Sequence, residues 1–136
     1  ALLHRFQLPE PRVALGVALR GIATACIDIS DGLAGDLAKL CAASGVGAEV
    51  DSRELPLSAG LCSAAGPEAR LRFALSGGDD YELLFTAPAA HRAQLAALEA
   101  GAVLRRIGVM SATAGVRIDG APPEREAGHG FDHFAG

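Results

Sequence analysis

The sequence carries little positive charge, and Lys39 is its single lysine. Its 136 residues have a formal net charge of -4 and a pI near 5.5. Nucleic-acid binding needs lysines and arginines clustered along one surface, where they neutralise phosphates. The arginines here are scattered apart from the pair at 105–106, so we expect no nucleic-acid partner.

Cysteine and long apolar runs are also scarce. The three cysteines lie far apart and form no Cys-x-x-Cys pair, which argues against a disulfide framework and a zinc site. We therefore expect reduced, mostly buried thiols at Cys26, Cys41 and Cys62. No eighteen apolar residues stand in a row, and residues 1–12 lack a signal-peptide layout. The sequence thus predicts a cytoplasmic protein with no membrane partner, and its start without methionine suggests a fragment.

Apolar residues make up 50% of the chain, which suits one globular domain with a core over residues 1–136. Periodicity and turn residues predict helices at 11–20, 31–44 and 88–99, a helix end at 69–75, and a loop with brief helices at 52–68. Strands are predicted at 23–29, 46–50, 81–86, 103–110 and 115–118. The first two strands and the helix between them predict a right-handed β-α-β unit. The fold class expected is α+β, with helices packed on a mixed β-sheet.

Two carboxylates and a hydroxyl lie at the end of the first predicted strand and just after it, in the run IDISDGL at 27–33. Asp28 and Asp31 repel each other when both are ionised, and a divalent cation between them removes that conflict. Magnesium takes one or two carboxylates together with phosphate oxygens and water. The start of the following helix suits a phosphate near Ser30 and Gly32. The run therefore predicts a site for magnesium and a nucleotide.

A plainer interpretation of the same residues stays open. Serine or aspartate before an apolar-periodic helix is the usual N-cap, whose side chain accepts a hydrogen bond from the first helical turn. Asp28 would then be a solvated strand end. Local chemistry favours this alternative slightly.

A second acidic run, LSGGDDYEL at 75–83, begins with paired glycines. Gly77 and Gly78 allow positive φ angles and a close approach of the backbone to a ligand, and Asp79 is the first of the carboxylates that follow. The alternative is a tight turn with solvated acids. A ligand-binding role is favoured over this alternative because the turns at 28–31 and 79–82 each border a strand of the same predicted sheet.

Other residues in these segments have structural interpretations. We expect Asp36 and Lys39 on the wet face of the helix at 31–44, and Tyr81 and Phe85 in the core. The acids at 80 and 82 are expected to serve solubility or turn hydrogen bonds. His129 and His133 have a helical metal spacing, but the glycines around them disfavour a helix and so disfavour ligation. No Gly-x-x-x-x-Gly-Lys loop occurs, which excludes the P-loop route to a nucleotide kinase.

Four blocks of residues, at 25–33, 75–85, 106–108 and 130–134, occur in an order that resembles the C-terminal half of the thiamine-monophosphate kinase family. The first two blocks are rather specific, and the four together span nearly the whole chain. The resemblance extends to the aminoimidazole ribonucleotide synthetase-like superfamily. That architecture joins an N-terminal dimerising domain to a C-terminal α+β domain, with ATP at their junction. It implies that residues 1–136 form the C-terminal domain and that the N-terminal domain is absent.

The resemblance implies transfer of the γ-phosphoryl group of ATP to thiamine monophosphate, which gives thiamine diphosphate and ADP. Asp28 and Asp31 match the family's Mg²⁺ ligands, and Ser30 matches its ATP contact. Asp79 stands where the family commonly has a glutamate that touches the thiamine substrate. Phe131 stands where the family has an aromatic residue, often Tyr or Trp, beside that substrate. Phosphoryl transfer of this kind needs positioning and charge neutralisation by metal, with no covalent enzyme intermediate.

Two other functions stay open: a related ATP-dependent synthetase of the same superfamily, and a non-catalytic partner-binding module whose acids only cap turns. The GGDDY run at 77–81 favours the kinase. The resemblance implies a homodimer at full length and places most of the remaining magnesium aspartates in the N-terminal half. We therefore expect this chain alone to turn over little or no substrate, because the phosphate charges would be neutralised incompletely.

Overall fold

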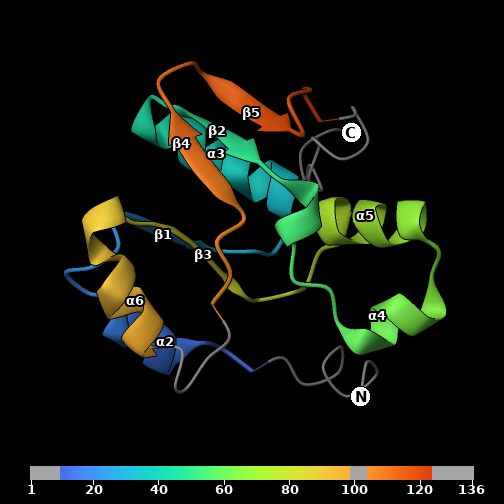
Figure 1. The fold of residues 1–136 in the computed structure, drawn as a ribbon, viewed down its shortest axis with the longest axis horizontal. Coiled ribbons are helices and arrows are strands. Elements are labelled where there is room, and N and C mark those ends of the chain that lie inside the picture. Colours follow the sequence, from blue (N-terminus) through green and yellow to red (C-terminus); the bar gives the residue numbers. More distant parts are fainter. Residues whose placement is uncertain (1–9, 99–103, 124–136) are drawn as a thin grey trace, which may run out of the picture.

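The computed structural model describes residues 10–98 and 104–123, in which helices and short strands alternate (Figure 1). The helices are α2 (Val13–Ala18), α3 (Leu33–Ser44), α4 (Ala59–Ala64), α5 (Pro67–Ser76) and α6 (Arg92–Leu98). The strands are β1 (Ala25–Asp28), β2 (Gly47–Val50), β3 (Leu83–Thr86), β4 (Gly108–Ser111) and β5 (Gly115–Ile118). Two 3₁₀ turns, η1 (Ser52–Glu54) and η2 (Ala89–His91), precede α4 and α6. These elements confirm the α+β class.

The strands of the described residues form two sheets. β1 pairs antiparallel with β3, and β2 lies between β4 and β5 (Figure 1). Because β2 is antiparallel to β4 and parallel to β5, the three-stranded sheet is mixed, as predicted. The predicted β-α-β crossover is wrong. β1 and β2 belong to different sheets, so α3 links one sheet to the other instead of joining two parallel neighbours.

Helix α3 supplies the centre of the core. Its predicted apolar stripe is buried, with exposed fractions of 7% or less at Leu33, Leu37, Leu40 and Cys41. The helix packs against β1, β2, β5 and α5 and ends at Gly45, as predicted. Each such side chain contributes about 1.5–3 kcal/mol when fully buried, so α3 fixes where the segments at its two ends lie.

Several boundaries differ from the sequence-based expectation. Helix α5 begins at Pro67, within the predicted loop, because proline suits the first helical position. The strand expected from residue 103 begins only at Gly108. The strand at 115–118 and the brief helices within 52–68 are confirmed.

The cysteines are free, but only one of them is buried. Cys41 lies in the core, Cys62 is partly buried and Cys26 is exposed. The expectation of mostly buried thiols is therefore wrong for Cys26, which alternates with the inward residues of β1.

Among the described residues, no helix has the length and apolar character needed to cross a bilayer.

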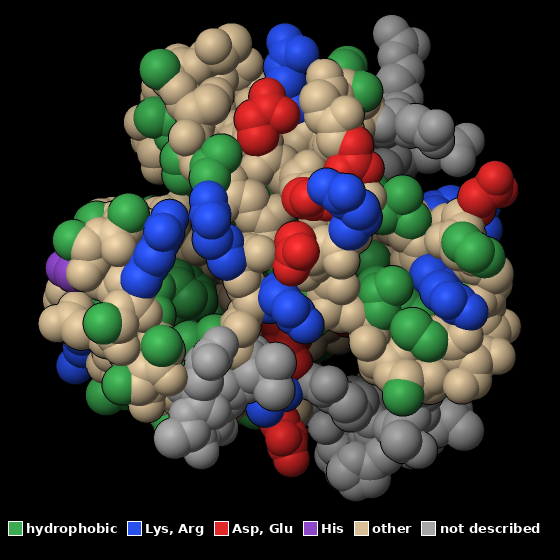
Figure 2. Space-filling model, in the orientation of Figure 1, with side chains coloured by type: hydrophobic (Ala, Val, Ile, Leu, Met, Phe, Trp, Pro, Cys, Tyr) green, Lys and Arg blue, Asp and Glu red, His purple; other side chains and the backbone are tan. Residues whose placement is uncertain are grey.

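Charged side chains of both signs are interspersed over the face seen in Figure 2. Acidic and basic groups alternate across its middle instead of gathering by sign. Among the described residues, Arg53 with Asp51 and Arg117 with Glu49 form ion pairs whose side chains are exposed.

Candidate functional site

The two acidic turns lie side by side at one end of the β1–β3 sheet. The amide of Ile29 donates to the carbonyl of Glu82 at 2.9 Å, which extends the strand pairing beyond Asp28. The amides of Asp79 and Tyr81 donate to the carbonyls of Ser30 and Ile29 at 3.0 and 2.9 Å. The expectation that both turns border the same sheet is confirmed.

The first turn presents the predicted ligands at the junction of β1 and α3. Asp28 ends β1 with its side chain exposed, whereas Ser30 and Asp31 are half-buried. The N-cap interpretation is wrong, because Gly32 occupies the N-cap position and no side chain caps α3. Ser30 and Asp31 therefore do not serve as caps.

Gly32 has φ 101° and ψ 145°, a conformation that side chains disfavour. A Cβ atom there would lie 3.0 Å from the Cα and carbonyl carbon of Ser76 at the end of α5. The turn is therefore held closely against α5, at a φ angle that favours glycine and with little space for a side chain.

Asp36 is the principal residue that sequence reasoning missed. Its side chain is only 3% exposed, so the predicted wet-face position is wrong. One carboxylate oxygen, Oδ2, accepts hydrogen bonds from the amides of Ser30 and Asp31 at 2.9 and 3.0 Å. The other oxygen, Oδ1, accepts from Lys39 Nζ at 3.0 Å. A buried carboxylate thus fixes the backbone that carries the candidate ligands.

The charge of Asp36 is well compensated. Burial raises its pKa, but the hydrogen bonds from Lys39 and from the amides of Asp31 and Ser30 outweigh burial, so the pKa lies below the usual aspartate value. Lys39 also forms an ion pair with Asp31. Hydrogen bonds to Asp31 and Asp36 raise the pKa of Lys39. Its side chain is 55% exposed, which agrees with the predicted wet face for this residue.

The second turn differs from the expectation for paired glycines. The positive φ angles fall on Asp79 (63°) and Tyr81 (49°), whereas Gly77 has φ -68°. The close approach is made by Gly78, where a Cβ atom would lie 2.7 Å from the carbonyl oxygen of Ser30. Left-handed backbone at residues other than glycine stores strain, and such strain is often found at functional sites.

Tyr81 is exposed, which overturns its predicted place in the core. Its hydroxyl donates to Asp79 Oδ1 at 3.0 Å. This hydrogen bond and the nearby charges of Asp79 and Asp28 raise the pKa of Tyr81. The phenol therefore orients the carboxylate that we expected to contact substrate. Phe85 is half-buried.

A bidentate ion pair connects the start of helix α2 to the second turn. Arg12 Nε and Nη2 donate to the two carboxylate oxygens of Glu82 at 2.9 and 2.8 Å. Parallel bonds of this kind fix geometry as well as charge. Glu82, for which solubility or turn hydrogen bonds were predicted, therefore also ties this turn to α2.

The junction of β1 and α3, which carries Asp28, Ser30 and Asp31 and is called the corner below, has oxygen donors that fit a hard divalent cation with phosphates. Asp28 and Asp31 provide oxygen donors, and magnesium commonly takes one or two carboxylates with the rest from phosphates and water. Within residues 10–98 and 104–123, no group of three or more His, Cys, Asp or Glu side chains is placed to hold a metal. Phe131, His129 and His133 lie outside the described residues.

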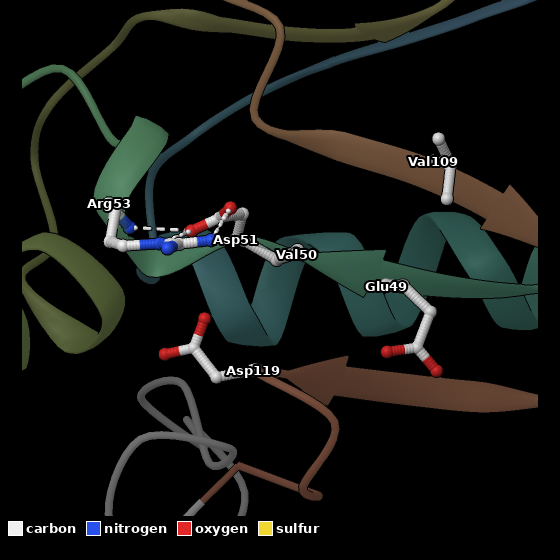
Figure 3. A pocket seen from close by; sticks show the side chains of 6 residues that line it. All are labelled: Glu49, Val50, Asp51, Arg53, Val109 and Asp119. Carbon is white, nitrogen blue, oxygen red and sulfur yellow. Dashed lines mark hydrogen bonds and ion pairs between the residues drawn. The ribbon is translucent and has the colours of Figure 1, made fainter.

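A shallow pocket of ≈ 510 Å³ lies elsewhere, where β2 ends beside η1 and β5 (Figure 3). Each of its charged residues already has a charged or polar partner. Arg53 Nε and Nη2 donate to Asp51 at 2.9 and 2.7 Å, and Asp119 accepts from the hydroxyl and amide of Ser52. None of the predicted site residues lines this pocket.

Comparison with known proteins assigns the class. Residues 7–120 match the family described as AIR synthase related protein, C-terminal domain, and the chain belongs to that family. It is 45% identical to the thiamine-monophosphate kinase of Salmonella typhimurium, over 98% of this chain and 42% of the relative. The Escherichia coli K12 thiamine-monophosphate kinase is 43% identical over the same shares. The resemblance drawn from the sequence blocks is confirmed.

Solved structures agree with this relationship. Thiamine-monophosphate kinase from Stenotrophomonas maltophilia superposes with a TM-score of 0.82 and 44% identity, over 85% of this chain and 37% of that one. AaThiL complexed with AMPPCP and TMP gives a TM-score of 0.80 and 34% identity, over 98% and 41%. The chain thus spans less than half the length of the relatives that it matches.

Proposed function

We propose that this chain is the C-terminal part of a cytoplasmic kinase that transfers the γ-phosphoryl group of ATP to thiamine monophosphate, giving thiamine diphosphate and ADP. The observation that carries the proposal is the joining of two acidic turns by backbone hydrogen bonds, beside a buried carboxylate that fixes one of them. The similarity to thiamine-monophosphate kinases over nearly the whole chain supports it. So does the neighbour that holds TMP and the ATP analogue AMPPCP.

In this proposal Asp28 and Asp31 are the magnesium ligands of the chain, and Ser30 contacts ATP. The bound metal neutralises phosphate charge. The amide of Ser30 already donates to Asp36, so its contact with the nucleotide would use the hydroxyl. The Asp36 carboxylate fixes the backbone of Ser30 and Asp31 before any ligand binds, and such positioning is the main contribution a protein makes to phosphoryl transfer.

Asp79 and Phe131 would contact the thiamine substrate. Asp79 is one carbon shorter than the glutamate common in the family, and Tyr81 holds its carboxylate through a hydrogen bond. A phenylalanine such as Phe131 can stack on a thiamine ring without offering a polar group. The shorter carboxylate predicts weaker substrate binding, which Asp79→Glu would strengthen.

The remaining parts of the site belong, in this proposal, to an N-terminal domain that binds ATP and forms a homodimer. The test joins this chain to the Salmonella typhimurium kinase in place of the matching 42% and measures thiamine diphosphate by chromatography. We expect turnover from the joined protein, little or none from the chain alone, and loss of turnover with Asp28→Ala or Asp31→Ala. Full activity of the chain alone, or of the joined alanine variants, would contradict the proposal.

A further inference from the structure

Lys39 joins the two carboxylates that surround the candidate ligand turn. Its ammonium group contacts Asp31 Oδ2 and lies 3.0 Å from Asp36 Oδ1. It is the single lysine of the chain, whereas every other strong cation is an arginine. An ammonium is a compact charge with three rotatable donors, so it can hold two carboxylates and exchange one of them without moving far.

The two carboxylates are not equivalent partners. Asp36 is 3% exposed and is fixed by two backbone amides, so its charge needs a permanent counter-charge. The Asp31 side chain is 25% exposed, and Asp28, three residues earlier, is exposed as well. Lys39 is therefore held by Asp36 and shared with Asp31.

We propose that Lys39 is a positioning residue that holds the Asp31 carboxylate until a divalent cation replaces its ammonium group there, while the ammonium stays on Asp36. This inference rests on the proposed function, which makes Asp31 a magnesium ligand. One positive charge relieves the repulsion between Asp31 and Asp36, and a dication brings the two charges needed for Asp31 and Asp28. The helix α3 that carries both Asp36 and Lys39 keeps the ammonium within reach in either state.

The first test uses the fact that one lysine gives one side-chain signal. Lysine labelled with ¹³C and ¹⁵N is incorporated into the 136-residue chain and into the joined protein described above, and Mg²⁺ is added. In the joined protein, the Lys39 signal is the one that Lys39→Met removes. We expect the Lys39 side-chain resonances to shift with Mg²⁺ and to broaden with Mn²⁺. The variant Asp31→Asn should abolish the Mg²⁺ shift, because the carboxylate that exchanges partners is gone.

The second test measures the affinity for Mn²⁺ by electron paramagnetic resonance. Lys39→Met and Lys39→Gln remove the competing charge, so we expect Mn²⁺ to bind about fivefold tighter or more. Arg53→Met is the matched control, because it removes one positive charge from Asp51, an aspartate outside the corner. Circular dichroism checks that each variant is folded. If Lys39→Met does not fold, the Mn²⁺ affinity of Lys39→Gln is used instead.

The outcomes separate the inference from the proposed function. The joined protein could be active while its Lys39 signal and Mn²⁺ affinity do not respond as stated. This result overturns the inference but leaves the proposed kinase function supported. A Lys39 response in a joined protein that makes no thiamine diphosphate supports the cation exchange and counts against the kinase. Absence of any divalent binding to the chain and to the joined protein overturns the inference.

Discussion

Replacing Asp36 with alanine tests whether a buried carboxylate holds the candidate site together. The substitution leaves the amides of Ser30 and Asp31 without their acceptor and Lys39 with one carboxylate instead of two. A buried donor left unpaired costs about 1–3 kcal/mol. Because Ser30 and Asp31 are half-buried, water satisfies part of this loss, and we expect Asp36→Ala to lower the free energy of unfolding by about 2–4 kcal/mol.

Urea unfolding followed by circular dichroism at 222 nm gives this free energy, and the midpoint should fall with little change in slope. Asp36→Asn keeps an oxygen that can accept from both amides, so its loss should be clearly smaller. Glu68→Ala, an exposed acid in the first turn of α5, is the control and should cost less than about 1 kcal/mol. If Asp36→Ala costs no more than this control, the buried carboxylate does not organise the turn.

Three further predictions concern the same corner. Gly32→Ala combines a positive φ with a tight contact of 3.0 Å against the backbone of Ser76 and should destabilise by about 2–4 kcal/mol in thermal unfolding. Gly45→Ala, where φ is 65° and the space is open, should cost about 1 kcal/mol, and equal losses would contradict the close approach. Asp79→Asn should lower the raised pKa of Tyr81, the single tyrosine, toward the ordinary value of about 10. A pH titration followed by absorbance at 295 nm measures this pKa, and an unchanged titration would refute the hydrogen bond. The pKa of Asp36 is lower in the folded than in the unfolded chain, so the stability that its charge provides is complete above about pH 4 and is lost as the pH falls toward the folded pKa. The urea midpoints of wild type and Asp36→Asn should therefore converge in acid. A constant gap between them would argue against this linkage.

The fold could be predicted from sequence wherever local periodicity decides it. The stripe from Leu33 to Cys41 is buried because helical spacing places these residues on one face, and the strand at 115–118 is confirmed residue for residue. The pairing of β1 could not be predicted, because alternation along a strand says which face is buried and does not name its neighbour. The crossover expected between β1 and β2 failed for this reason.

The candidate site was partly predictable. The sequence placed the turns at 28–31 and 79–82 each beside a strand of one predicted sheet, as the structure confirms. The role of Asp36 was misjudged because charge was taken as a sign of exposure. The spacing held the opposite signal: Asp36 stands three residues after Leu33 and four before Leu40, within the buried arc of α3. The strain at Tyr81 left no local signal, because it depends on hydrogen bonds to a strand about fifty residues earlier.

The order of strands around β2 also bears on how the chain acquires its structure. Both neighbours of this strand, β4 and β5, are synthesised about sixty residues later. Until they emerge from the ribosome, β2 exposes unpaired amides and carbonyls along both of its edges, and such edges are open to association with other chains. Completion of the three-stranded sheet is therefore tied to the last described strand, and a nascent chain that stops before Gly108 should depend on chaperones to stay dispersed.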